Sequence, residues 1–255
     1  MINRILKKIR QKSRLEEYKS ILLYALKNDY KIVSLYEWYE NYKTSNSKIL
    51  ILRHDVDYDT KGAYAMYKIE KMLGVHSTFY FRWSSMNDKL MREMNKNGFE
   101  ISLHFETLAD YAKDNKIYKS EEVDNKVVTI CQQKLSEEIE LFEKKFWKIH
   151  TICSHGDKRN RVLSLPNHII WNEATKNKYR ILFETYEKSI IGQFDAYISD
   201  SSIYRNFEWQ HYGSPIDAID KNRQTICLLT HPIHWNQSFF NNIRMLSKVY
   251  FDNRY

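Results

Sequence analysis

The sequence predicts an α/β fold in which about seven parallel strands alternate with helices and curl into a distorted (β/α) barrel. Short runs of apolar and β-branched residues recur along the chain, and segments with apolar residues at helical spacing follow several of them. Acids or histidines stand at the ends of five of these runs. A length of 255 residues is enough to close one such core. An open, doubly wound sheet remains the structural alternative.

We predict that residues 1–47 form an N-terminal extension that packs on the barrel and that residues 48–255 form the barrel itself. Within the extension we expect a helix at 15–27, a strand at 30–35, a short helix at 36–42 and a polar loop at 44–47. Six Gly and three Pro leave little material for a flexible linker. The whole chain is therefore predicted to be a single domain.

Strands and helices are then expected to alternate through the barrel. The segments with strand character span residues 48–53, 77–83, 99–105, 149–154, 195–199 and 225–230. Those with helical spacing span residues 60–73, 87–97 and 120–145. Gly74 and Gly98 directly follow the first two helices, at a position where glycine commonly ends a helix. Alternating strands and helices are typical of a parallel sheet.

Most of the formal net charge of +8 comes from the first 14 residues, which contain six basic residues and no acidic one. Ile2, Ile5, Leu6 and Ile9 recur there at helical spacing, so two interpretations stay open. Residues 2–14 form either a basic amphipathic helix that contacts an anionic membrane or a solvated terminal helix. Nucleic acid would also suit a basic chain, but the two signs nearly cancel elsewhere. We therefore predict no nucleic-acid partner.

The sequence has no apolar run near the roughly 20 residues that span a bilayer, and no recognisable secretion signal. We therefore expect a cytoplasmic protein, with peripheral contact at the inner membrane face as an option. Cys131, Cys153 and Cys227 are widely spaced, which argues against disulfides and against a thiolate zinc site. We expect them to be buried as small apolar residues.

Polar residues gather at the carboxyl ends of the predicted strands, where α/β folds bind their ligands. In chain order these are His54-Asp55-Val56-Asp57, His104 with Glu106, Ser154-His155-Gly156-Asp157, Asp200, and Thr230-His231-Pro232. Taken singly, each histidine is better explained as a structural residue. Taken together, His104, His155 and His231, three of the chain's nine histidines, indicate a functional site.

Histidines and carboxylates without thiolates are the ligands of zinc, or of another divalent metal, that keeps one position open for water. Such a metal lowers the pKa of its water to about 7, and an additional Asp and His could act as base and acid. The sequence contains no nucleophile elbow, P-loop, dinucleotide-binding turn or His-Glu-x-x-His helix. A divalent metal, most readily zinc, is therefore the predicted cofactor.

Five motifs carry a family resemblance. They are Leu52-Arg53-His54-Asp55-Val56-Asp57, Ser77-Thr78-Phe79-Tyr80-Phe81, Gly98-Phe99-Glu100-Ile101-Ser102-Leu103-His104, Ser154-His155-Gly156 and Leu229-Thr230-His231-Pro232. In this order they resemble the polysaccharide deacetylase superfamily, the NodB-like family 4 carbohydrate esterases, over roughly residues 48–236. The resemblance is closest to the divergent Asp-Val-Asp branch associated with surface polysaccharide loci. It implies a NodB-like barrel with a metal at the strand ends, and an enzyme that removes acetyl groups from N-acetylated sugars.

The resemblance also implies roles for individual residues. Asp55 matches the family's catalytic base, and His231 matches the general acid that protonates the leaving amine. Asp57 matches the metal-binding aspartate, although Val56 separates two acids that are adjacent in the family. Alternation along an extended strand would put Asp55 and Asp57 on the same side. His104 matches the first histidine of the family's His-x-x-x-His metal motif.

Leu108 stands where that motif has its second histidine, and a leucine cannot ligate a metal. We predict that His155 supplies the missing imidazole, with Glu106 as the runner-up ligand. Arg53 or Arg159 matches the arginine that pairs with the catalytic acid in the family.

Three further residues have open assignments. Asp200 either matches the family's late orienting acid or is a turn residue at a strand end. Trp235, together with His234, either forms an aromatic wall for a sugar or packs as an ordinary loop residue. Asp157, which follows His155 closely, is a candidate supporting residue.

These observations predict a metal-dependent hydrolase that removes acetyl groups from an N-acetylated sugar of a surface polysaccharide or its precursor. The predicted partner is therefore a carbohydrate, and an O-acetyl ester is also chemically accessible. The alternative, motivated by Leu108, is a catalytically inactive carbohydrate-binding or scaffold protein on the same barrel.

Overall fold

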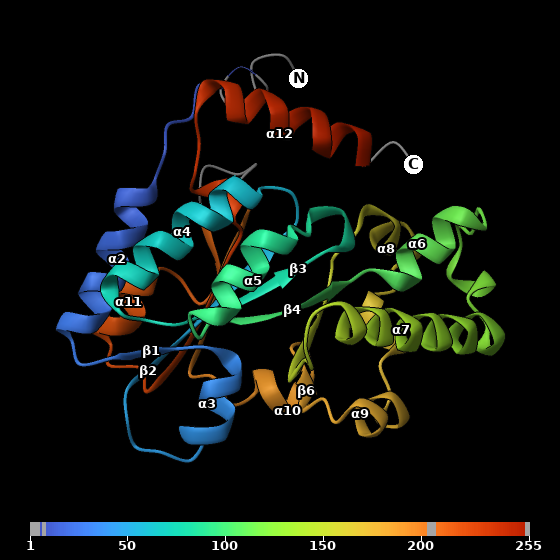
Figure 1. Cartoon of the computed structure of the whole chain (residues 1–255), viewed down its shortest axis with the longest axis horizontal. Helices are drawn as coiled ribbons and strands as arrows, with labels where there is room; N and C mark the ends of the chain where they lie inside the picture. Colours follow the sequence, from blue (N-terminus) through green and yellow to red (C-terminus); the bar gives the residue numbers. More distant parts are fainter. Residues whose placement is uncertain (1–5, 7–8, 203–207, 253–255) are drawn as a thin grey trace. The chain divides into compact units, whose positions relative to one another are not determined.

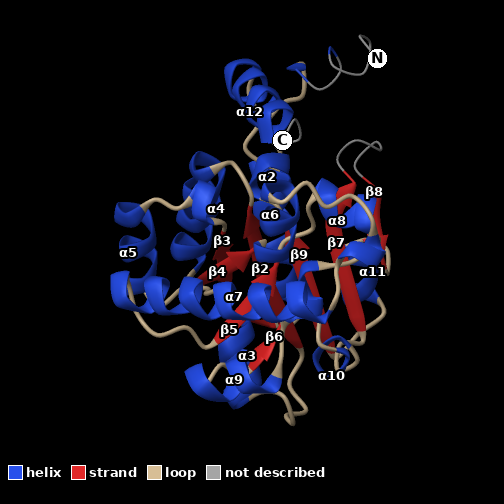
Figure 2. Ribbon diagram, turned by 90° about the vertical axis from the view of Figure 1, so that its right-hand side faces the viewer, coloured by secondary structure: helices blue, strands red, loops and turns tan. Residues whose placement is uncertain are grey.

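The computed structural model describes residues 6, 9–202 and 208–252, and the chain forms two compact units (Figure 1). Unit 1 takes Met1–Ile101 and Gly192–Arg254, and unit 2 takes Ser102–Ile191. Strands alternate with helices in both units (Figure 2). The predicted α/β class is therefore confirmed.

Unit 1 is built on strands that pair in the order β3-β2-β9-β7-β8. Their bounds are β2 (Ile49–Val56), β3 (Thr78–Phe81), β7 (Ala196–Ser202), β8 (Glu208–His211) and β9 (Thr225–Thr230). β1 (Lys31–Val33) adds to the first half of β2. The pairings of β2 with β1, β3 and β9, and of β9 with β7, are parallel as predicted. β8, which pairs antiparallel with β7, has no counterpart among the predicted strands.

β2 is buried along all eight of its residues, as expected for a parallel strand with neighbours on both faces. Leu50 and Leu52 join a core cluster with apolar side chains of α2 (Leu15–Lys27) and α4 (Thr60–Leu73). The strand ends at Val56 rather than at the predicted Arg53. Asp55 therefore lies within the strand and not after it, which corrects the sequence-based placement.

The helices of unit 1 are α2, α3 (Leu35–Asn41), α4, α5 (Asp88–Lys96), α11 (Pro215–Asp220) and α12 (Phe239–Asp252), with short 3-10 turns η1 (Trp83–Ser85) and η4 (Pro232–His234). α2 and α4 have the predicted bounds. Gly74 ends α4 with a φ of 69°, and Gly98 follows α5 with a φ of 84°. Both conformations are easy only for glycine, so the predicted helix ends are confirmed.

Unit 2 contains three parallel strands in the order β4-β5-β6. These are β4 (Glu100–Phe105, whose first two residues belong to unit 1), β5 (Thr151–Ser154) and β6 (Phe183–Glu184). Its helices are α6 (Thr107–Asp114), α7 (Asn125–Lys145), α8 (Lys158–Leu163), α9 (Glu173–Tyr179) and α10 (Lys188–Ile191), with 3-10 turns η2 (Ser120–Glu122) and η3 (Asn167–Ile170). The predicted helix at 120–145 begins only at Asn125, because the Asp124 side chain caps it there.

The predicted basic helix at residues 2–14 lies partly outside the described residues. Within the described part, Leu6 and Ile9 are helical, Arg10 lies in a turn, and residues 11–14 have no helical structure. No helix in the described ranges is both long enough and apolar enough to cross a membrane. The three cysteines are free and buried, as predicted. The division at residues 47 and 48 and the single domain stay predictions.

Candidate active site

The carboxyl end of β2 holds a buried ion pair between Arg53 and Asp55. The guanidinium Nε donates to Oδ1 of Asp55 at 2.9 Å, and Nη2 donates to Oδ2 at 2.8 Å. Residues two apart on a strand share a face, and the two parallel bonds fix the plane of the carboxylate. Arg159, the other candidate partner, instead donates to the carbonyl groups of Ala112 and Ile117 in unit 2.

Asp57 follows the end of β2 at a bend in the chain and is partly buried. The expected alternation therefore holds for Arg53 and Asp55 but ends before Asp57, because regular strand geometry stops at Val56. The charges of Asp57 and Asp55 both help to raise the pKa of His231. The two carboxylates and this imidazole thus belong to one electrostatic environment in unit 1.

Asp200 and His231 form the second pair in unit 1, where the parallel strands β7 and β9 end. The Nδ1 atom of His231 lies 2.6 Å from Oδ1 of Asp200, and the backbone N–H of His231 donates to both carboxylate oxygens at 3.1 and 3.0 Å. The carboxylate therefore fixes both the ring and the backbone of His231. Asp200 therefore contacts the residue that the family resemblance implies as the acid, and its assignment as the orienting acid stays a prediction.

The charges in this pair stabilise each other. Burial disfavours a charge on His231, but the Asp200 carboxylate, with smaller effects from Asp57 and Asp55, outweighs burial and raises the pKa of His231 to about 9. Burial likewise opposes the charge of Asp200, yet the neighbouring His234 and His231 hold the pKa of Asp200 well below its usual range. His231 is therefore an imidazolium at neutral pH.

His234 and Trp235 also contact Asp200, and the sequence did not predict these contacts. The indole Nε1 of Trp235 donates to Oδ2 at 2.7 Å, and Nδ1 of His234 lies 3.3 Å from the same oxygen. Trp235 is fully buried, with its ring against Tyr18 and Trp209. An aromatic wall for a sugar needs an exposed ring, so that interpretation of Trp235 is wrong. Trp235 packs in the core and holds Asp200 in place.

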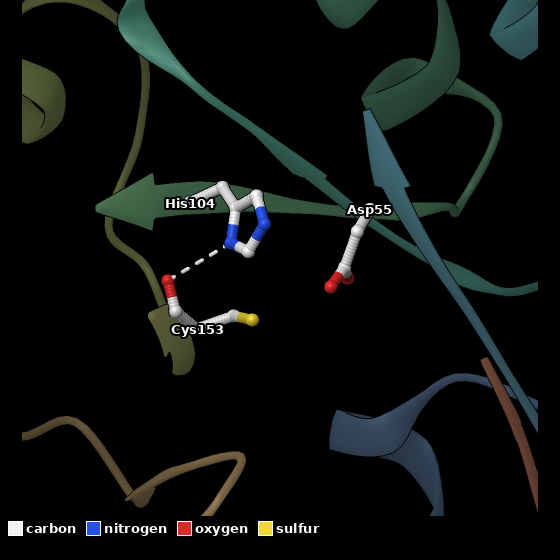
Figure 3. Close-up of side chains that lie close together, drawn as sticks. All are labelled: Asp55, His104 and Cys153. Carbon is white, nitrogen blue, oxygen red and sulfur yellow. Dashed lines mark hydrogen bonds between the residues drawn. The ribbon is translucent and has the colours of Figure 1, made fainter. Parts of the chain in front are cut away.

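Unit 2 brings two of the predicted metal ligands together. The rings of His104 on β4 and His155 after β5 lie edge to face, with centroids 5.1 Å apart. Nδ1 of His104 lies 3.2 Å from the carbonyl oxygen of Cys153, which can only accept a hydrogen bond (Figure 3). The proton of a neutral His104 ring therefore lies on Nδ1, and Nε2 carries the lone pair that a metal would bind.

His155 is oriented by Glu106, the residue predicted as its rival for the metal. Oε2 of Glu106 lies 3.1 Å from Nδ1 of His155, and both side chains are buried. Histidines that bind zinc usually pair their second nitrogen with a carboxylate or a carbonyl group in this way. Leu108 is fully buried on α6, in keeping with an apolar role.

Glu106, His155 and Asp157 each offer one ligand atom, and these atoms lie within 4.8 Å of one another. Imidazole and carboxylate donors without thiolate fit zinc. Asp157, however, already caps α8 and receives a bond of 2.9 Å from Lys113. Burial opposes the charge of Lys113, but Asp157 outweighs it and raises the pKa of that amine. Asp157 is therefore better described as a structural support of the His155 loop.

A cavity of about 320 Å³ borders His155 within unit 2. Ser154, Arg161, His168 and Tyr186 are among its lining residues. The rings of His168 and Tyr186 stack with centroids 6.0 Å apart. Burial lowers the pKa of His168, so this ring is neutral at physiological pH. The cavity thus combines an aromatic surface with hydroxyl groups and one cation.

His54 lies within the Arg-His-Asp motif, but it points away from Asp55. Its Nδ1 lies 2.6 Å from Oγ1 of Thr230, and its Nε2 lies 3.1 Å from Oε1 of Glu70 on α4. The hydroxyl group of Tyr18 donates to the same oxygen at 2.7 Å. The sequence did not predict this buried network, although strand alternation alone places His54 on the face opposite Arg53 and Asp55.

No family model matches the chain, and no curated protein matches it. The chain is similar to a solved family 4 carbohydrate esterase from Streptomyces lividans in complex with acetate, with 12% identity over 79% of this chain and 89% of that chain and a TM-score of 0.42. It is also similar to the catalytic domain of peptidoglycan N-acetylglucosamine deacetylase from Eubacterium rectale ATCC 33656, with 15% identity, coverage of 82% and 86%, and a TM-score of 0.45. A family 4 carbohydrate esterase from Bacillus anthracis gives 14% identity, coverage of 93% and 85%, and a TM-score of 0.42.

Proposed function

We propose that this chain is a metal-dependent hydrolase that removes acetyl groups from N-acetylated sugars. The observation that carries the proposal is the pair of preorganised groups in unit 1. A carboxylate held by an arginine, Asp55, and an imidazolium held by a carboxylate, His231, stand at the ends of the paired strands β2 and β9. A fixed base and a fixed acid are what amide hydrolysis needs.

Asp55 acts as the base in this proposal. Its bidentate pair with Arg53 fixes the direction of the carboxylate, so it can accept a proton from an attacking water without first reorienting. His231 acts as the acid, because its raised pKa of about 9 keeps it protonated at neutral pH. Its Nδ1 is engaged by Asp200, so Nε2 is the atom that would deliver a proton to the leaving amine.

The proposed metal ligands are Asp57, His104 and His155, with zinc as the most suitable ion. A bound zinc ion would polarise the acetyl carbonyl group and lower the pKa of the attacking water. The support in unit 2 is the edge-to-face pair of His104 and His155, each of which uses Nδ1 for a protein contact. Asp57 is proposed as the third ligand on the family resemblance alone.

The substrate is proposed to be a sugar of a surface polysaccharide or its precursor, on the strength of the Asp-Val-Asp resemblance. The aromatic and hydroxyl lining of the cavity beside His155 is chemically suited to a sugar ring. A cytoplasmic location and membrane contact through residues 2–14 remain predictions from the sequence.

The test is acetate release from N-acetylglucosamine oligomers. The purified chain is stripped with a chelator, reloaded with zinc and assayed beside Asp55→Asn and His231→Gln. Asp114→Asn and His150→Gln, both at exposed positions, serve as matched controls. We expect zinc-dependent acetate release that is lost in the first two variants and kept in the controls. Oligomer binding by a folded, zinc-loaded wild type that releases no acetate would contradict the proposal and favour the scaffold alternative.

A further inference from the structure

One face of α12 exposes a row of large apolar side chains. Phe239 is 55% exposed, Phe240 82%, Ile243 42% and Tyr250 61%. Residues 239, 243 and 250 recur at intervals that return to the same side of a helix, and Phe240 adjoins them. An exposed apolar row of this kind on a single helix indicates an interaction surface. We call these four residues the α12 stripe.

The opposite side of α12 packs on unit 1. Met245 is buried there, and so is Asn242. The basic N-terminal segment lies against this side, because Nδ2 of Asn242 donates to the carbonyl groups of Ile9 at 3.1 Å and Gln11 at 2.9 Å. Figure 1 shows α12 in red along one edge, and Figure 2 shows the same helix nearly end-on. The α12 stripe and the basic segment therefore belong to one region of unit 1.

Basic side chains lie beside the α12 stripe. Arg244 and Lys248 follow it on the next part of the helix surface, and both are exposed. Arg244 also forms an ion pair with Asp59 at 3.4 Å, which offsets part of its charge. Arg10 and Lys12 are exposed on the neighbouring N-terminal segment. Residues 1–14 contain six basic residues and no acidic one, and residues 239–252 contain a single acid, Asp252. An apolar row beside an excess of cations is complementary to anionic headgroups above an acyl layer.

We propose that the α12 stripe and the basic N-terminal segment dock this protein on the surface of an anionic lipid bilayer. The aromatic side chains enter the interface between headgroups and acyl chains, where aromatic rings are most favourable. The cations contact lipid phosphates around them. Unlike the membrane contact predicted for residues 2–14 alone, this surface has its apolar part on α12. It depends on neither the proposed metal nor the proposed reaction.

The experiment uses the full-length chain and sedimentation with two vesicle types, pure phosphatidylcholine and phosphatidylcholine with roughly 30% phosphatidylglycerol. We expect binding to the anionic vesicles that falls when salt rises from about 0.1 M to about 0.5 M. Phe239→Ser with Phe240→Ser should weaken binding at least about tenfold. Arg10→Gln with Lys12→Gln should weaken it about fivefold for each charge removed.

Met72→Ser is the matched control, because Met72 on α4 is 62% exposed and lies outside the α12 stripe. Its vesicle binding should equal that of the wild type. Three results would overturn the proposal. The first is a folded wild type that does not sediment with anionic vesicles, and the second is an equal loss of vesicle binding in the control and in the double Phe variant. The third is a wild type that binds no vesicles and is a dimer in light scattering, while the double Phe variant is a monomer. The last result would assign the surface to a second copy of the chain.

Discussion

Replacing Asp200 by Asn should remove the charge that keeps His231 protonated. The Asp200 carboxylate raises the pKa of His231 from 6.5 to about 9, although burial of the ring works in the opposite direction. That interval corresponds to about 3 kcal/mol of net stabilisation of the His231 imidazolium in the folded chain, to which Asp57 and Asp55 also contribute. Asn keeps the shape of Asp but not its charge. The pKa of His231 in the variant should therefore fall well below about 9, because only the smaller effects of Asp57 and Asp55 then oppose burial.

The pair of Asp200 and His231 also makes the stability of the folded chain depend on pH. Each partner sets one limit of the pH range in which the pair is stabilising. The pKa of His231 is higher in the folded chain, so its contribution is complete below about pH 6.5 and is lost as pH rises through about 9. The pKa of Asp200 is lower in the folded chain, so its contribution is present above about pH 4 and is lost as pH falls further. The difference in the free energy of unfolding between the wild type and Asp200→Asn should therefore be largest between about pH 4 and about pH 6.5.

Two measurements check this reasoning. NMR titration of the histidine ring protons gives the pKa of His231 directly, and urea unfolding at about pH 5, 7 and 9.5 gives the stability difference. Asp220→Asn is the matched control, because Asp220 accepts a hydrogen bond from Tyr24 at the exposed surface. An unchanged titration of His231 in Asp200→Asn, or a stability difference that is the same at all three pH values, would refute the argument.

Three further outcomes are expected. His155→Ala should lower zinc affinity at least about 10- to 100-fold, and Glu106→Ala should lower it less, as measured by competition with a chromophoric chelator. Equal losses of zinc affinity in the two variants would make Glu106 a zinc ligand. A chain that lacks residues 1–14 should keep its acetate release, and loss of turnover in a folded truncation would show that this segment supports the chemistry. Glu70→Gln should destabilise the fold by about 1 to 3 kcal/mol in urea unfolding, because the amide cannot accept both hydrogen bonds that Tyr18 and Ser77 donate to the two oxygens of Glu70. The exposed Glu93→Gln should have no such effect.

Segments with strong periodicity could be predicted from the sequence almost to the residue. α4 carries apolar residues at helical spacing and ends at a glycine with positive φ, and β9 has an unbroken apolar run between its two terminal threonines. The short elements could not be predicted, because β6 has two residues and α6 has eight. Elements of these lengths are too short to show the periodic spacing of apolar residues that identifies a strand or a helix. β8 is only partly buried, and its pairing with β7 decides its structure.

The candidate site was predictable where it follows from strand geometry. Arg53 and Asp55 share a face because they are two residues apart on β2, and their pairing is a local consequence of that spacing. Trp235 was not predictable in the same way, since an aromatic residue near a site is equally compatible with a sugar platform and with the core. Its contact with Asp200 decides the matter, and that partner lies 35 residues away in the sequence.

Contacts on the two faces of β2 relate the position of the proposed base to that of the proposed acid. His54 and Thr230 are register partners in β2 and β9, and their side chains also bond to each other on the face opposite Asp55. Asp55 and His231 each come one residue later in the sequence, and Asp55 is among the charges that raise the pKa of His231. A slip of one residue would separate His54 from Thr230 and shift His231 relative to Asp55. The buried bond between His54 and Thr230, supported by Glu70, therefore specifies the register on which the proposed chemistry depends.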